Sequence, residues 1–117
     1  MSQVINLAEK LATFTEVYQP RTVATFNQHD IMVVKFKGEF PWHSHTDTDD
    51  FFLVLKGQMR IDIEGNSMNL HEGDLFVVPR GIQHRPSADE ECHVLLMERT
   101  GTPNTGDVQT AQPRRVI

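Results

Sequence analysis

The sequence predicts an all-β fold, an antiparallel sandwich or barrel, in one domain of 117 residues. Three observations support this. Apolar residues fall in short runs, glycine or proline turns separate the runs at regular intervals, and a helical pattern is absent after residue 21. Short strands with regular turns are typical of antiparallel sandwiches and barrels. A chain of this length can bury one core without disulfide bonds.

Residues 1–20 form a separate N-terminal segment, in which Asn6 can cap a short helix over residues 7–12. The domain itself is expected over residues 21–99. Its predicted strands are the apolar or alternating runs at residues 22–26, 31–36, 51–55, 59–63, 75–78 and 94–97. Turns are expected at residues 56–57, 64–66, 72–74 and 79–81. Residues 100–117 contain little that is apolar, and we expect an extended tail.

Composition excludes several classes of protein. The formal net charge of −5 argues against nucleic-acid and anionic-membrane partners, which need a basic surface. No apolar run approaches the ~20 residues that span a bilayer, and residues 1–10 do not resemble a secretory signal. The single cysteine, Cys92, excludes an internal disulfide framework and makes a cytoplasmic location the default expectation. Cys92 itself is expected to be a small core residue.

Two histidines and an acidic cluster suggest a metal site. His43 and His45 are two residues apart, so on a strand both imidazoles lie on one face, roughly 7 Å apart. The acidic residues that follow can supply oxygen ligands. On the strand after them, Asp50 shares a face with Phe52 and Asp49 lies on the opposite face. Alternation alone leaves open which face points into the barrel.

His84 is distant in sequence from this pair, but it comes directly after the predicted turn at residues 79–81. A strand that starts there can direct His84 into the same cavity. The other three histidines, His29, His71 and His93, are expected to be structural or exposed.

Two segments resemble the motifs of the cupin superfamily, and the resemblance covers residues 22–98. Residues 38–57, GEFPWHSHTDTDDFFLVLKG, match the first motif at Gly38, His43, His45, Asp50 and Gly57. Residues 73–88, GDLFVVPRGIQHRPSA, match the second motif at Gly73, Pro79, Gly81 and His84. The gap after Gly38 is one residue shorter than usual, and Ala88 stands where the family has asparagine.

The resemblance implies a double-stranded β-helix, or jelly-roll barrel, preceded by the short N-terminal helix. It also implies one divalent transition metal inside the barrel. Its ligands would be His43, His45, Asp50 and His84, so Asp50 would face inward. Imidazole with carboxylate suits Fe, Mn, Ni, Cu or Zn, and the spacing does not choose among them.

Asp50 departs from the family, which has glutamate at this position. Its side chain is one methylene shorter, so its carboxylate reaches about 1.5 Å less, and metal–ligand bonds tolerate little of that. Three arrangements follow. Asp50 binds after a backbone shift, or it holds a metal-bound water, or the site has three histidine ligands and more open positions.

The resemblance implies a metal-dependent enzyme that acts on a small molecule, and among enzymes we favour an oxygenase. Two alternatives stay open, because fold does not dictate function. One is a sugar-phosphate isomerase or epimerase similar to mannose-6-phosphate isomerase, and the other is a non-catalytic sensor of a small molecule or a metal. Candidate substrate contacts are Phe36, Phe52, Met59, Phe76 and Gln83.

If Asp50 faces inward, residues 51, 53 and 55 form an outward apolar strand face that needs a cover. The N-terminal segment or a second subunit can supply that cover, and we expect a homodimer.

Overall fold

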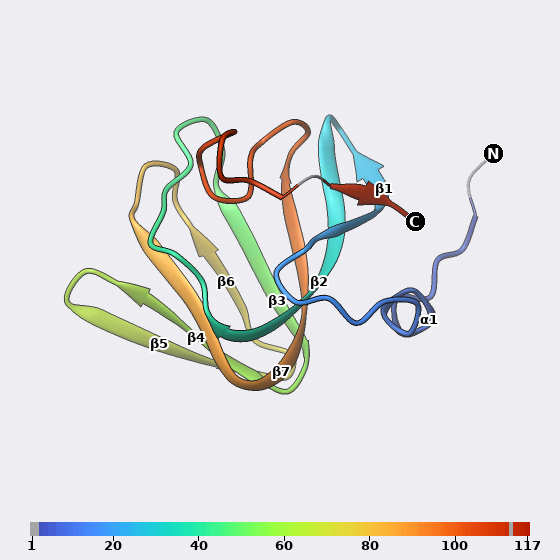
Figure 1. Cartoon of the computed structure of the whole chain (residues 1–117), viewed down its shortest axis with the longest axis horizontal. Helices are drawn as coiled ribbons and strands as arrows, with labels where there is room; N and C mark the ends of the chain where they lie inside the picture. The colour runs from blue at the N-terminus through green and yellow to red at the C-terminus, as the bar shows by residue number, and fades with distance from the viewer. Residues whose placement is uncertain (1–2, 113) are drawn as a thin grey trace.

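The computed structural model describes residues 3–112 and 114–117. It is the predicted all-β barrel with one short helix (Figure 1). The elements are α1 (Leu7–Leu11), β1 (Arg21–Phe26), β2 (His29–Glu39), β3 (Asp50–Lys56), β4 (Gln58–Ile63), β5 (Asn66–His71), β6 (Leu75–Val78), β7 (His84–Arg99) and β8 (Arg115–Val116). Asn6 caps α1 as expected, because its side-chain oxygen accepts a hydrogen bond from the backbone N–H of Glu9 at 2.9 Å.

The 16-residue strand β7 joins the two layers of the barrel. Its first part pairs with β4, its last part pairs with β3, and β2 lies along most of its length. The pairing shifts where Phe36 and Gly38 face Cys92 and Ala88, which leaves residues 89–91 as a bulge. A bulge bends the strand that carries it. One strand can therefore bring both His84, at its start, and Glu98, near its end, into the interior of the barrel.

The barrel interior is an apolar core supplied by alternating residues. In β3, residues 50, 52 and 54 are buried while residues 51, 53 and 55 are half-buried on the outer face. This is the period-two pattern of a strand with one face on a core. The resulting core comprises Met32, Val34, Phe36, Phe52, Val54, Met59, Ile61, Leu70, Val78, Ala88, Cys92, Val94 and Leu96. Cys92 is completely buried and packs here as expected.

The N-terminal segment covers part of the outer face. Leu11 and Phe14 form a second buried cluster with Val23 and Val33, and Leu55 packs against it. Phe14 also lies under two cations, since the Arg21 guanidinium is 4.4 Å and the Lys35 ammonium 4.8 Å from its ring centre. The segment therefore supplies one of the two covers that the sequence suggested.

Gly57 makes the tight turn between β3 and β4. Its φ is +86°, and a Cβ there would lie 3.1 Å from the backbone oxygen of Glu91. The backbone conformation and the close approach both require glycine.

After β7 the chain makes a series of turns and ends as β8, which pairs in parallel with β1. This C-terminal segment, red in Figure 1, folds over one end of the barrel. Among the described residues, no helix has the length and apolar character needed to cross a membrane.

Candidate metal centre

Three histidines and one aspartate from distant parts of the chain converge inside the barrel. His43 and His45 lie between β2 and β3, Asp50 begins β3, and His84 begins β7. One potential ligand atom from each lies within 4.8 Å of the others, and all four residues are buried. The backbones of His43 and His84 bond to each other in both directions, at 3.0 and 2.8 Å, which holds the two segments in register.

Backbone carbonyls orient two of the imidazole rings. His43 Nδ1 lies 2.9 Å from the Pro41 carbonyl oxygen, and His84 Nδ1 lies 2.9 Å from the Ile82 carbonyl oxygen. A carbonyl only accepts, so each Nδ1 carries the proton that it donates. In the neutral ring Nε2 then keeps a free lone pair, the arrangement of a metal-ligating histidine.

The remaining polar atoms need a cation. His84 Nε2 lies 3.0 Å from Asp50 Oδ2, so two acceptors face each other unless a second proton or a metal ion lies there. His45 Nε2 lies 3.3 Å from the same oxygen, yet neither ring nitrogen of His45 has a hydrogen-bond partner. Asp50 Oδ1 also has none. A buried polar atom without a partner costs about 1–3 kcal/mol. A metal ion bound here would satisfy the Asp50 carboxylate and one ring nitrogen of His45, since each residue offers one ligand atom.

The electrostatics of the cluster keep it ready for a cation. Burial would raise the pKa of Asp50, but the neighbouring His45 and His84 rings outweigh it and hold this pKa below its ordinary range. Burial, helped by His84, lowers the pKa of His43 to about 4. At neutral pH the cluster therefore presents an ionised carboxylate and a neutral His43 ring, which are the forms that bind metals.

Glu98 is a site residue that we did not predict from the sequence. Its Oε2 lies 3.1 Å from His45 Nε2, and its Oε1 accepts a hydrogen bond from Arg114 Nη2 at 2.8 Å. Burial and the charge of Asp50 raise the pKa of Glu98 well above its ordinary value, while Arg114 opposes this. The alternation of residues in the last strand could have indicated Glu98, because position 98 lies on the same inward face as Val94.

An apolar cavity lies beside the cluster. Its lining includes His43, Asp50 and Glu98 and the side chains of Tyr18, Val34, Phe36, Phe40, Phe52, Pro86 and Leu96. Of the five candidate substrate contacts, Phe36 and Phe52 line this cavity. Met59 and Phe76 pack in or against the core elsewhere, and Gln83 is exposed and donates a hydrogen bond to the Ser44 hydroxyl at 3.1 Å.

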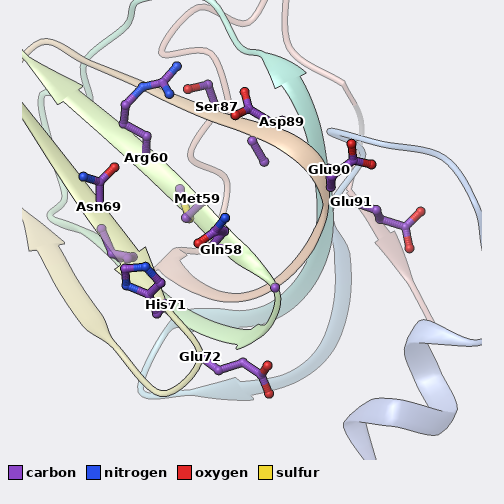
Figure 2. Close-up of a pocket in the computed structure, with 13 residues that line it drawn as sticks. Gln58, Met59, Arg60, Asn69, His71, Glu72, Ser87, Asp89, Glu90 and Glu91 are labelled. Atoms are coloured by element: carbon purple, nitrogen blue, oxygen red, sulfur yellow. The ribbon is translucent and has the colours of Figure 1, made fainter.

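A much larger groove lies away from the cluster. Figure 2 shows it around β4, β5 and the bulge of β7, where Arg60, Asn69, His71 and Asp89 surround it. It has a volume of about 810 Å³, but none of the four cluster residues lines it. The chemistry of the donor atoms, and not the size of the groove, identifies the candidate site.

Comparison with known proteins agrees with this fold. Residues 30–98 match the family model described as a cupin domain. The protein YdbB of Bacillus subtilis (strain 168) is 31% identical over 86 residues, which is 73% of this chain and 76% of YdbB. The chain belongs to the cupin family.

Solved structures are also similar. A cupin-2 domain containing protein from Shewanella frigidimarina NCIMB 400 has a TM-score of 0.81 and 38% identity, over 82% of this chain and 94% of that protein. Protein NMB1881 from Neisseria meningitidis has a TM-score of 0.77 and 32% identity, over 84% of this chain and 100% of that protein.

Proposed function

We propose that the protein is a metal-dependent enzyme that binds one divalent transition metal through His43, His45, Asp50 and His84. The observation that carries this proposal is the convergence of three imidazoles and a carboxylate within 4.8 Å in a buried site, with the nitrogens of His45 left without partners. The donor set suits Fe, Mn, Ni, Cu or Zn. Asp50 acts as a direct ligand, since its carboxylate reaches the space that the three rings share.

The walls of the cavity favour an oxygenase with a small, largely apolar substrate. Tyr18, Phe36, Phe40 and Phe52 surround the space beside the cluster, where they exclude water and can hold an apolar molecule against the metal. A metal with an open position supplies Lewis-acid chemistry or dioxygen activation. A sugar phosphate fits less well, because the cavity lining described by the structure contains neither lysine nor arginine to bind a phosphate.

A non-catalytic metal sensor is the second candidate, and one observation favours it. The free volume of the cavity is about 30 Å³, room for no more than a few water molecules. In this conformation a metal ion fits and a substrate does not.

Metal analysis tests the first part of the proposal. The purified protein, stripped of metal and reconstituted separately with Fe(II), Mn(II) and Zn(II), should retain one equivalent after gel filtration. The His43→Ala/His45→Ala variant should retain none. The matched control is His71→Ala/His93→Ala, which removes two histidines outside the cluster and should behave as the parent protein does. An absence of bound metal in every reconstituted parent sample contradicts the proposal.

Oxygen consumption distinguishes an oxygenase from a sensor, once a nitric oxide probe has shown whether the bound iron has an open coordination position. Nitric oxide added anaerobically to the Fe(II)-loaded protein should produce the EPR signal of a high-spin iron–nitrosyl centre, because nitric oxide occupies the position where dioxygen would bind. Oxygen consumption by the Fe(II)-loaded protein is then screened against small aromatic and aliphatic acids and phenols. A nitrosyl signal without oxygen uptake above that of the His43→Ala/His45→Ala variant supports the sensor.

We also propose a homodimer through the outer apolar face, defined as Phe51, Leu53, Leu75, Val77 and Met97. These residues are adjacent, since Phe51 pairs with Val77 and Met97 and Leu53 pairs with Leu75. Leu75 and Val77 are 54% and 40% exposed. The described part of the N-terminal segment covers Leu55 on the same side, and the cluster that it forms includes none of these five residues. A contiguous exposed apolar patch of this kind favours a protein interface.

Sedimentation equilibrium tests the dimer. The parent protein should sediment with the mass of two chains, and Leu75→Lys/Val77→Lys should sediment as one chain because two buried charges oppose association. Val4→Lys is the control, since Val4 is fully exposed and distant from the outer apolar face in sequence. A monomeric parent protein at every concentration contradicts the dimer.

A further inference from the structure

The cavity beside the metal cluster is narrow. Its free volume of about 30 Å³ excludes any organic substrate, so part of its wall must move before one can enter. A larger groove of about 500 Å³ lies on the other side of that wall. Three side chains, Tyr18, Phe40 and Asn104, line both the narrow cavity and this larger groove. These three side chains therefore separate the metal cluster from the outside at this point.

Two of the three side chains are held firmly. The Tyr18 ring stacks on Phe36 at 4.8 Å and on Phe40 at 4.9 Å, measured between ring centres. Its hydroxyl donates a hydrogen bond to the Gly38 carbonyl. Tyr18 keeps this position although its φ of 57° is unfavourable for a bulky residue, so its contacts must over-determine it.

Asn104 is bound to its own segment, since its side-chain oxygen accepts a hydrogen bond from the backbone N–H of Gln112 at 3.0 Å. It belongs to residues 100–112, which make turns and form no strand. These residues lie over the end of the barrel in Figure 1. The outer groove is lined by this segment and by Trp42, with Thr105, Asp107, Thr110 and Gln112 contributed by the segment. A segment without strand pairing can move at lower free energy than the sheet beneath it.

Arg114 fastens the end of this segment to the cluster. Its guanidinium donates hydrogen bonds to Asp30 Oδ2 and Glu98 Oε1, both at 2.8 Å. Thr100, at the start of the segment, donates to Asp30 Oδ1 at 2.8 Å. The second oxygen of Glu98 lies 3.1 Å from the His45 ring. One carboxylate thus contacts both a histidine of the cluster and the residue that holds the segment in place.

Gly106 provides a second point of attachment. It has a φ of +76°, and a Cβ at this position would overlap the Ser44 carbonyl oxygen. The segment therefore rests directly on the backbone between His43 and His45. Only glycine permits both the left-handed conformation and this contact.

We propose that residues 100–112 are a lid over the metal cavity, that Arg114 is its latch, and that substrate enters beside Tyr18 and Phe40 when Asn104 withdraws. Tyr18 and Phe40 then contact the incoming molecule first and select a flat, apolar one. This selectivity deepens the proposed function, and it rests on that function for the nature of the substrate. Opening of the lid is a property of the chain itself and is measurable without any metal.

Trp42 reports on the lid in the metal-free protein. It is the single tryptophan and lines the outer groove with the lid. Acrylamide quenching of its fluorescence should rise in Arg114→Ala and in Gly106→Ala, by up to about twofold, the ratio of full exposure to its present 46%. Arg115→Ala is the matched control, since Arg115 is exposed and next to the latch, and it should quench as the parent protein does. Gly106→Ala leaves the ion pairs of Asp30 and Glu98 intact, so a folding defect in Arg114→Ala cannot hide the result.

Zinc release measures access to the cavity. Zn(II)-loaded protein is mixed with excess pyridylazoresorcinol, and the rate of complex formation is followed by absorbance. Arg114→Ala and Gly106→Ala should release zinc at least about tenfold faster, because loss of charge-assisted hydrogen bonds or of close packing shifts the opening equilibrium by that order. Equal quenching and equal release rates in the parent and both variants overturn the lid. Failure of every sample to bind zinc counts against the proposed metal site, and the quenching result alone then decides the lid.

Discussion

Protonation of His43 is expected to destabilise the metal-free protein as the pH falls. The ring is only 6% exposed, and its Nδ1 already donates to the Pro41 carbonyl. Its Nε2 side faces the rings of His45 and His84, whose centres lie 4.9 and 4.3 Å away. A second proton would place a positive charge in this space without water around it.

The size of the effect follows from the pKa. Burial first, and His84 second, lower the pKa of His43 from 6.5 to about 4. The unfolded chain therefore takes up this proton near pH 6.5 and the folded chain only near pH 4. Stability is complete above pH 6.5 and is lost as the pH falls toward 4. The difference between the His43 pKa values of the unfolded and the folded chain corresponds to about 3 kcal/mol of unfolding free energy.

Urea unfolding in EDTA at pH values from 7 to 4 measures the loss. The parent protein should lose about 3 kcal/mol more than His43→Gln over this range. Glu98 has the opposite effect on stability, because its raised pKa favours the folded state at lower pH. The comparison with His43→Gln is therefore needed to isolate the contribution of His43. His71→Gln is the control, as His71 is 66% exposed on its side chain and away from the cavity. An equal pH dependence of unfolding in the parent protein and His43→Gln would refute the argument.

Three further outcomes test the packing and are measured by urea unfolding unless stated otherwise. Gly57→Ala should lower the free energy of unfolding by about 2–4 kcal/mol, from backbone strain plus overpacking. Gly65→Ala should lower it by only about 1–2 kcal/mol, from strain alone, because a Cβ there meets nothing within 4 Å. Equal losses in the two variants would contradict the close contact at Gly57. Phe52→Ala should cost about 3–5 kcal/mol because its ring is fully buried in the core; a cost below about 1 kcal/mol would place the ring outside the core. Burial raises the pKa of Cys92 to about 11, so the thiol should react with Ellman's reagent only after unfolding, and rapid reaction of the native protein would contradict its burial.

Local sequence patterns account for most of the barrel. Alternation in β3 and β4 and the glycine turns around them predicted those strands, because the side chains of a strand point to its two faces in turn. The edge strand β5 was not predicted. It pairs only with β4, and residues 66, 67 and 69 are polar and exposed. A strand with one buried residue, Leu70, has too weak an alternation to be recognised.

The continuity of β7 was missed for a different reason. The sequence predicted one strand starting near His84, after the turn at residues 79–81, and another at residues 94–97, whereas β7 runs from His84 to Arg99 as a single strand. Its inward residues change from His84 and Pro86 to apolar ones after the bulge, so no single alternating pattern runs through it. The bulge itself is an outcome of pairing with β2, which neither strand encodes alone.

The sequence by itself determined the fold class and singled out the four residues of the candidate metal centre, because they fall at matching positions in two short motifs that resemble those of the cupin superfamily. Only the tertiary structure decided how the centre is enclosed. Glu98, Arg114 and Asp30 meet although Arg114 follows Asp30 by 84 residues, and no local pattern marks Asn104 or Gly106. Contacts between distant segments depend on the path of the whole chain, so they appear only when the barrel is closed.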